Sequence, residues 1–461
     1  MMTNEINKAA DIIKIPRRVL GTLLNAYAAG VVPRFGLEYI AIGRSSEIGA
    51  FLSDFDAIAS GMGTFRFVIG KYGSGKSFLI GLVRCNALER NFITADCDLS
   101  PERRFHGSKG QGLAAFRELM KNLGSKSSPD GGALPSILTR WLSGLQTNAV
   151  KNGFSPDTPV FFSEVEKDIY SVTDDLCSLV NGFDFAKVLK KYYDGVIKGN
   201  DDEKESALRW LRGEFSTKQE ARSCGLGTSS IIDDANWYDY IKLYAAFFRR
   251  IGYKGFIVLF DEGVNLYKIP NRLSRENNYE KILSMFNDTL QGKAEGLGIV
   301  LGGTPAFLED NRRGLFSYEA LKSRLEEGRF TGDRRNLISP VIKLNRLSDD
   351  ELYALVERVM KLHSQYYGVQ LQLTEQNIVT FLKICLERMG ADEMITPREV
   401  IRDFLNILNI MLQDKSVTFD ELVGNKNNIK LEKASESDKE NNDSSEEGND
   451  DDFFNLGKLE L

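Results

Sequence analysis

Four short stretches of the chain are apolar without the polar alternation of a half-exposed strand. They are residues 65–69, 92–95, 256–260 and 297–303. The last three lead directly into Asp96, Asp261 and Thr304. Apolar runs of this length are typical of strands buried on both faces of a parallel sheet. The pattern therefore predicts an α/β fold with a parallel sheet, whose ligand crevice lies at the carboxyl ends of the strands.

Most of the remaining chain has apolar residues at helical spacing. In the N-terminal stretch 9–27, Pro16 must interrupt or restart the helix, and Ser45 and Ser46 could cap the helix that follows. Further helices are expected at 76–88, 113–123, 134–149, 160–180, 183–197, 237–251, 347–367, 374–389 and 397–413. About 155 residues separate the second and third apolar runs, far more than one crossover helix needs. We interpret the excess as a helical insertion.

These patterns divide the chain into five segments. We expect an N-terminal helical segment at 1–38, an α/β core at 39–124 and 231–345, an α-helical insertion at 125–230, a helical lid at 346–423 and an acidic tail at 424–461. Asn, Lys, Glu, Ser and Asp dominate the tail, and this composition cannot bury enough apolar surface to fold. The tail is therefore predicted to be disordered.

Composition and charge narrow the class of protein. The hydrophobic fraction is 42% and the charged fraction 27%, and no run of eighteen apolar residues suggests a membrane span. The N-terminus lacks the pattern of a secretory signal, so we expect a cytoplasmic protein. Five scattered cysteines and two histidines favour neither a disulfide framework nor a zinc site. The net charge of −6 arises in residues 432–461, which hold eleven Asp or Glu and three Lys, so the body is near neutral and neither demands nor excludes nucleic acid.

A glycine-rich loop follows the first apolar run. Its residues are Gly70, Lys71, Tyr72, Gly73, Ser74, Gly75, Lys76 and Ser77, which match the pattern GxxxxGK[ST]. The glycines let backbone N–H groups surround phosphates at a helix N-terminus, Lys76 can reach the β and γ phosphates, and Ser77 can bind Mg²⁺. Because the loop lies between a strand and a helix, we interpret it as a Walker A motif that binds ATP, rather than as a simple glycine turn.

Asp261 and Glu262 end the third apolar run in the manner of a Walker B motif. Asp261 is the candidate for organising Mg²⁺, and Glu262 for polarising the attacking water. An Asp-Glu pair after a strand is also a common helix cap. With the phosphate loop in the same chain, we favour catalysis, and the two motifs together predict a Mg²⁺-dependent ATP hydrolase.

Two threonine–proline pairs offer further candidates. Thr304 precedes Pro305 and could contact the γ-phosphate or the attacking water, but it could equally cap the next helix. Arg398 follows Thr396 and Pro397 at the head of a lid helix and could reach the phosphates, or it could be a solvated first-turn arginine. The candidates for an arginine finger toward a neighbouring subunit are Arg312, Arg313 and Arg324, and each could instead be solvated.

The order of these motifs resembles the AAA+ branch of P-loop ATPases, particularly the ORC and STAND-like forms, over residues 40 to 410. More narrowly, the chain resembles the ATP-binding proteins of BREX-type bacterial phage-defence loci. The phrases that carry this resemblance are Ile42-Gly43-Arg44-Ser45, Asp98-Leu99-Ser100-Pro101-Glu102-Arg103-Arg104-Phe105-His106-Gly107, Arg209-Trp210-Leu211-Arg212-Gly213-Glu214 and Arg313-Gly314-Leu315-Phe316-Ser317-Tyr318-Glu319-Ala320-Leu321.

The resemblance implies specific roles. Gly43 and Arg44 would flank the adenine, Thr304 would act as sensor 1 and Arg398 as sensor 2. The residues expected to contact the nucleotide are Gly43, Arg44, the loop 70–77 and Phe78. Ser77 and Asp261 are expected to bind the metal. The residues expected to take part in catalysis are Glu262, Lys76, Thr304 and Arg398.

The family also implies partners and a biological setting. It implies defence against phage beside other gene products, including helicases, with DNA and an ATP-dependent homo-oligomer as open possibilities. Two alternatives remain at this point. One is a nucleotide-dependent switch or scaffold with negligible turnover, and the other is a DNA-loading protein of the replication-initiator type.

Overall fold

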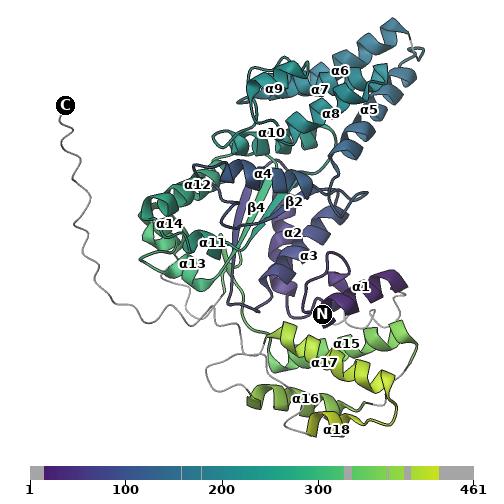
Figure 1. Ribbon diagram of the computed structural model, residues 1–461, viewed down its shortest axis with the longest axis vertical. Coiled ribbons are helices and arrows are strands. Elements are labelled where there is room, and N and C mark those ends of the chain that lie inside the picture. Colours follow the sequence, from purple (N-terminus) through teal and green to yellow (C-terminus); the bar gives the residue numbers. More distant parts are fainter. Residues whose placement is uncertain are drawn as a thin grey trace, which may run out of the picture.

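The computed structural model describes residues 15–424 except 157, 178, 327–334, 370, 372 and 389–395. The expected acidic tail, 424–461, lies outside these residues except for Gly424. The described chain is elongated (Figure 1). A parallel sheet occupies its middle, a group of helices forms one end, and a second, smaller group forms the other.

The sheet has five parallel strands in the order β2-β3-β4-β1-β5. Their bounds are β1 Thr64–Ile69, β2 Ile93–Asp98, β3 Phe256–Asp261, β4 Leu297–Gly303 and β5 Val341–Lys343. The second strand continues through Asp96 to Asp98, beyond the end of its apolar run, because it pairs with β3 until Asp98 lies beside Asp261. This register brings two carboxylates to the same edge of the sheet.

Alternate side chains of the strands enter two separate hydrophobic cores. In β3, Phe256, Val258 and Phe260 face one core while Ile257 and Leu259 face the other. The same alternation holds in β4 and β1. It follows from the period of two in a strand and explains why the runs show no polar alternation, since both faces are covered by helices.

Two groups of helices cover the sheet. The core helices are α2 Ser45–Ala59, α3 Lys76–Glu89, α4 Gln111–Lys121, α10 Trp237–Arg250, α11 Val264–Tyr267, α12 Arg272–Leu290, α13 Pro305–Glu309 and α14 Glu319–Leu325, with short 3₁₀ turns η2 Leu37–Ile40 and η3 Leu315–Ser317. α2 and α3 pack on one face, whereas α4, α10 and α12 pack on the other. The prediction of a serine cap for α2 is wrong, because Arg44 occupies the N-cap position and the helix already begins at Ser45.

The helices between β2 and β3 extend the core instead of forming a separate one. They are α5 Leu134–Lys151, α6 Pro159–Cys177, α7 Gly182–Lys198, α8 Asp201–Leu211 and α9 Lys218–Ser223. α10 joins them to the sheet through aromatic contacts: Trp141 packs edge-to-face on Phe247 at 5.1 Å and Phe185 on Tyr244 at 5.2 Å between ring centroids. These helices therefore share one hydrophobic core with the face of the sheet that α10 covers.

The C-terminal helices share a core with the N-terminal helix. They are α15 Asp349–Tyr367, α16 Glu375–Arg388, α17 Pro397–Gln413 and α18 Phe419–Gly424. α1, Arg17–Ala28, starts directly after Pro16 and buries Leu20, Leu23, Leu24 and Tyr27 against this group. The N-terminal segment therefore packs with the lid helices, although some 320 residues separate α1 from α15 in the sequence.

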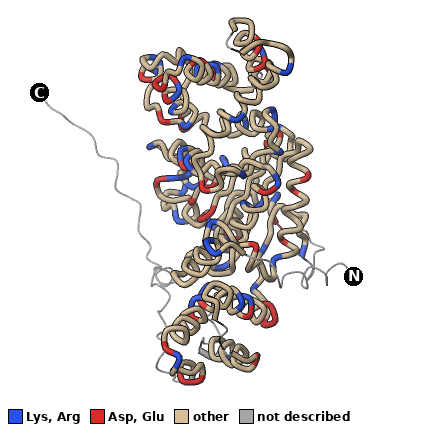
Figure 2. The backbone as a smooth tube through the Cα atoms, turned by 90° about the vertical axis from the view of Figure 1, so that its right-hand side faces the viewer, with Lys and Arg blue, Asp and Glu red and all other residues tan. Residues whose placement is uncertain are grey.

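Two surface properties of the described residues bear on partners. In Figure 2, Lys and Arg are interspersed with Asp and Glu over the sheet region and both groups of end helices. None of the helices described is both long enough and apolar enough to cross a membrane.

Candidate active site

The phosphate loop connects the end of β1 to the start of α3. α3 begins at Lys76, and its N-cap Gly75 has φ 91°, while Gly73 has φ 71°. Only glycine adopts these left-handed angles without strain. The backbone N–H groups of the first helical turn are therefore left open toward an anion, as the GxxxxGK[ST] pattern predicts.

Lys76 closes the loop on itself. Its Nζ donates hydrogen bonds to the carbonyl oxygens of Gly70 at 2.9 Å and Lys71 at 3.0 Å. Burial lowers the pKa of Lys76, while the nearby carboxylates of Asp261 and Glu262 act in the opposite direction. An ammonium held in this position is preorganised for an anion, because phosphate oxygens can replace its two carbonyl partners.

Ser77 and Asp261 meet at the edge of the sheet. The Oγ of Ser77 donates to Oδ2 of Asp261 at 2.7 Å, and Oδ1 of Asp261 accepts the backbone N–H of Glu262 at 2.8 Å. A hydroxyl and a carboxylate held this close are hard oxygen donors of the kind that Mg²⁺ prefers beside phosphates. The residues present therefore fit a magnesium ion, which would neutralise phosphate charge there.

Glu262 has an unusual backbone for its residue type. Its φ is 58°, in the left-handed region that non-glycine residues rarely adopt. The next residue, Gly263, donates its N–H to Gly302 of β4, which fixes the chain immediately after the turn. Strain of this kind concentrates at functional sites. Desolvation and the neighbouring Asp261 also raise the pKa of Glu262, which brings the carboxylate closer to a useful general base.

Arg44 ties the phosphate loop to the start of the lid. It is almost fully buried, and its guanidinium donates to the carbonyl oxygens of Ser74 at 2.8 Å and Asn345 at 3.0 Å. The carboxylate of Glu47, 3.6 Å away, balances its charge. Arg44 lines the pocket wall, whereas Gly43 turns the chain with φ 72° and packs beneath Leu347.

The head of α17 reaches the phosphate loop. Thr396 and Glu399 form a capping box there, and a Cβ added to Gly73 would lie 2.0 Å from Cγ2 of Thr396. Two residues along, Arg398 enters the same pocket as Lys76 and Glu262. The lid thus contributes to the pocket from a segment more than 300 residues distant in sequence.

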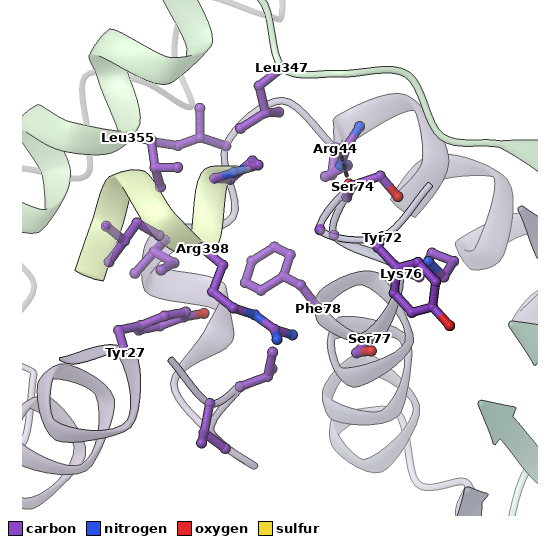
Figure 3. A pocket seen from close by; sticks show the side chains of 18 of the residues that line it. Tyr27, Arg44, Tyr72, Ser74, Lys76, Ser77, Phe78, Leu347, Leu355 and Arg398 are labelled. Carbon is purple, nitrogen blue, oxygen red and sulfur yellow. Dashed lines mark hydrogen bonds between the residues drawn. The ribbon is translucent and has the colours of Figure 1, made fainter. Parts of the chain in front are cut away.

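The opposite end of this pocket is apolar. Figure 3 shows Tyr27 and Arg398 on one side, Lys76 and Ser77 on the other, and Phe78 between them. The remaining apolar lining is Val31, Val32, Ile40, Ile42, Leu347, Leu355, Pro397 and Ile401. Apart from Phe78, the sequence did not indicate these residues as site residues, because each occupies an ordinary apolar position in or beside a helix.

The other candidates are not among the residues that line this pocket. Thr304 is the N-cap of α13, where its Oγ1 accepts the N–H of Phe307 at 3.3 Å. Arg313 packs over the ring of Tyr267, with 5.4 Å between its guanidinium carbon and the ring centroid, so its side chain is engaged within its own chain. Arg312 and Arg324 are exposed.

Comparison with known proteins assigns the family. No curated protein matches the chain. The family described as BREX system ATP-binding protein BrxC/D matches residues 15–427, which covers the sheet, the inserted helices and the lid. The chain therefore belongs to the BREX system ATP-binding protein BrxC/D family.

Proposed function

We propose that this protein is a Mg²⁺-dependent ATP hydrolase of the AAA+ type, whose nucleotide cycle drives conformational change and assembly within a bacterial phage-defence system. The observation that carries the proposal is the meeting of Lys76, the Ser77–Asp261 pair and Glu262 at one sheet edge. These groups supply a phosphate ligand, a metal site and a base, the three parts that phosphoryl transfer to water requires. A bound Mg²⁺ would withdraw charge from the phosphates as the bond to the leaving group breaks.

The protein's own residues have distinct tasks in this proposal. Lys76 leaves the Gly70 and Lys71 carbonyls and binds the phosphate oxygens, while the backbone N–H groups of the loop hold the remaining charge. Glu262 orients the attacking water and accepts its proton. It lies at the end of β3 with a left-handed backbone and lines the pocket.

Arg398 and Thr304 are proposed as the residues that sense the γ-phosphate. Arg398 and Lys76 line the same pocket, so a phosphate bound there would attract both cations. Because Arg398 lies on the lid helix α17, its attraction to phosphate would draw the lid toward the loop. Thr304 can cap α13 and also contact the γ-phosphate, because the two roles are compatible. The exposed candidates for an arginine finger toward a neighbouring subunit are Arg312 and Arg324.

A nucleotide-dependent switch with negligible turnover is the second candidate. It is favoured by the close approach of Gly73 and Thr396, since any shift of the phosphate loop must move the lid. In either case the partners would be other proteins of the defence system, with helicases and DNA among the candidates. A DNA-loading role ranks third. Mass measurement with and without ATP and with and without DNA would separate motor, switch and loader.

The direct test is phosphate release from ATP with Mg²⁺. We expect Lys76→Ala to abolish release, because the phosphates lose their main cationic ligand, and we expect omission of Mg²⁺ to do the same. Lys121→Ala is a matched control, since this lysine lies at the end of α4 and its side chain is 74% exposed. Undiminished release by Lys76→Ala would refute the assigned site, and ATP binding without release by the wild type, alone or with partners, would favour the switch.

A further inference from the structure

The hydroxyl of Tyr27 is a buried polar group without a partner. Tyr27 lies in the last turn of α1, and it is 5% exposed among the lid leucines. Its hydroxyl has no hydrogen-bond partner in the part of the chain that the structure describes. An unpaired buried hydroxyl is unfavourable, and a native fold rarely retains one without a use for it. The question is therefore what this hydroxyl binds.

The surroundings of Tyr27 point to a ligand. The residue lines the same cavity as Lys76 and Glu262. In Figure 3 its hydroxyl and the guanidinium of Arg398 point toward the middle of that cavity, where Phe78 lies. Burial raises the pKa of Tyr27, and the charge of Arg398 partly opposes this, so the hydroxyl remains protonated and can both donate and accept.

The rest of this end suits the uncharged half of a nucleotide. Val31 is 58% exposed although it borders a cavity whose other walls are largely apolar. A flat base seated between Val31, Ile42 and Leu355 would cover exposed apolar surface. Small-molecule sites usually have this composition, with apolar walls and a few polar groups that fix the orientation of the ligand. The phosphates are placed at the opposite end, by the loop.

We infer that Tyr27 recognises the nucleoside of the bound nucleotide through a hydrogen bond from its hydroxyl to the base or the ribose. This inference rests on the proposed ATP site. It makes α1 part of that site. Because α1 packs on α15 and α17, it implies that nucleotide binding links this group of helices to the phosphate loop. Selectivity among nucleotides would then arise in residues outside both Walker motifs.

Calorimetric titration of the full chain with Mg²⁺-ADP and Mg²⁺-ATPγS tests the inference. Tyr27→Phe keeps the ring and removes the hydroxyl, and we expect it to weaken both ligands by about fivefold, the effect of one neutral hydrogen bond. Tyr193→Phe is the matched control. That tyrosine also has a buried hydroxyl without a partner among the described residues, but it lies in α7 and should leave affinity unchanged.

Nucleotide analogues identify the atom that the Tyr27 hydroxyl contacts. The loss caused by Tyr27→Phe should vanish for the one analogue that lacks the contacted group, tested among 2′-deoxy, 3′-deoxy, 7-deaza and 6-unsubstituted purine nucleotides. A loss confined to ATPγS would place the hydroxyl on the γ-phosphate and overturn the inference, as would unchanged affinity for every ligand. If the wild type binds no nucleotide, or Lys76→Ala binds as well as the wild type, the proposed ATP site fails instead.

Discussion

The two ends of the pocket are built in different ways. At the phosphate end, Lys76 and Ser77 come from the loop and Asp261 from the end of β3. Ser77 donates to Asp261 at 2.7 Å, and Lys76 donates to the loop carbonyls of Gly70 at 2.9 Å and Lys71 at 3.0 Å. At the nucleoside end, Tyr27 and Ile401 come from α1 and α17, and apolar packing holds them together. The first end is rigid and charged, whereas the second depends on how the lid and α1 sit on the core.

This difference assigns separate tasks to the two ends. Hydrogen bonds to the sheet edge fix the phosphate end, so changes there should alter chemistry while the fold remains. Apolar packing of α1 and the lid helices forms the nucleoside end, so changes there should alter affinity. The two ends meet where Gly73 lies against Thr396, and this contact is where one can report to the other.

Glu262→Gln should have the largest effect and should separate chemistry from binding. Removing the base should lower phosphate release by about 10²- to 10⁴-fold, the range for general-base catalysis. Nucleotide affinity should stay within about threefold of wild type, because glutamine keeps the shape and the loop is untouched. Glu89→Gln is the control, since this carboxylate is 74% exposed at the end of α3. Normal steady-state release by Glu262→Gln would remove Glu262 from its role.

Gly73→Ala should disconnect the two ends. The added Cβ would lie 2.0 Å from Cγ2 of Thr396, and φ of +71° strains any L residue, so the loop or the head of α17 must move. We expect nucleotide affinity to fall at least tenfold by calorimetry. Gly49→Ala in α2 is the control, because nothing lies within 4 Å of its Cβ position and the helix should gain stability. Full affinity in Gly73→Ala would mean that the loop and lid do not need this contact.

The same contrast explains what the sequence could predict. The apolar runs predict the strands and the GxxxxGK[ST] spacing predicts the phosphate loop, because each of these is a pattern of consecutive residues. The pairing of distant strands, which brings Asp261 to Ser77, follows from the order expected of a parallel sheet. β5 has three residues, too few for a pattern, and was not expected. The role of Tyr27 depends on α1 packing against α15 and α17, a contact between distant segments that no local pattern encodes. Arg44 was expected beside the adenine from the family, and this stays a prediction. It lines the pocket, and its hydrogen bonds are to Ser74 and Asn345.

Val31→Asp should test the apolar end by charge. The side chain is 58% exposed, so the fold should tolerate the substitution. A carboxylate on the pocket wall would repel the phosphates, and it would replace an apolar contact with the base by a charged group. We expect affinity for Mg²⁺-ADP to fall about five- to tenfold, the equivalent of about 1 kcal/mol. Val150→Asp is the control, since it is 46% exposed at the end of α5. Equal affinity in the two variants would place the base elsewhere.

The smallest expected effect concerns acid pH and the lid. His363 on α15 is 1% exposed, and its Nε2 lies 3.1 Å from Oδ1 of Asn409 on α17. Burial lowers the pKa of His363. The unfolded chain therefore takes up this proton first, and stability is lost as pH falls below about 6.5 toward the folded pKa.

Between pH 7.5 and 5.5, the midpoint of thermal unfolding should decrease in the wild type. In His363→Gln the decrease should be about 1 °C smaller, because glutamine does not titrate and can still bond Asn409. His106→Gln is the control, since His106 is exposed and is the chain's other histidine. A pH response equal in all three proteins would show that the lid core is not where acid acts. A smaller response in His363→Gln would place the acid-sensitive point at the α15–α17 contact, outside the residues that line the pocket.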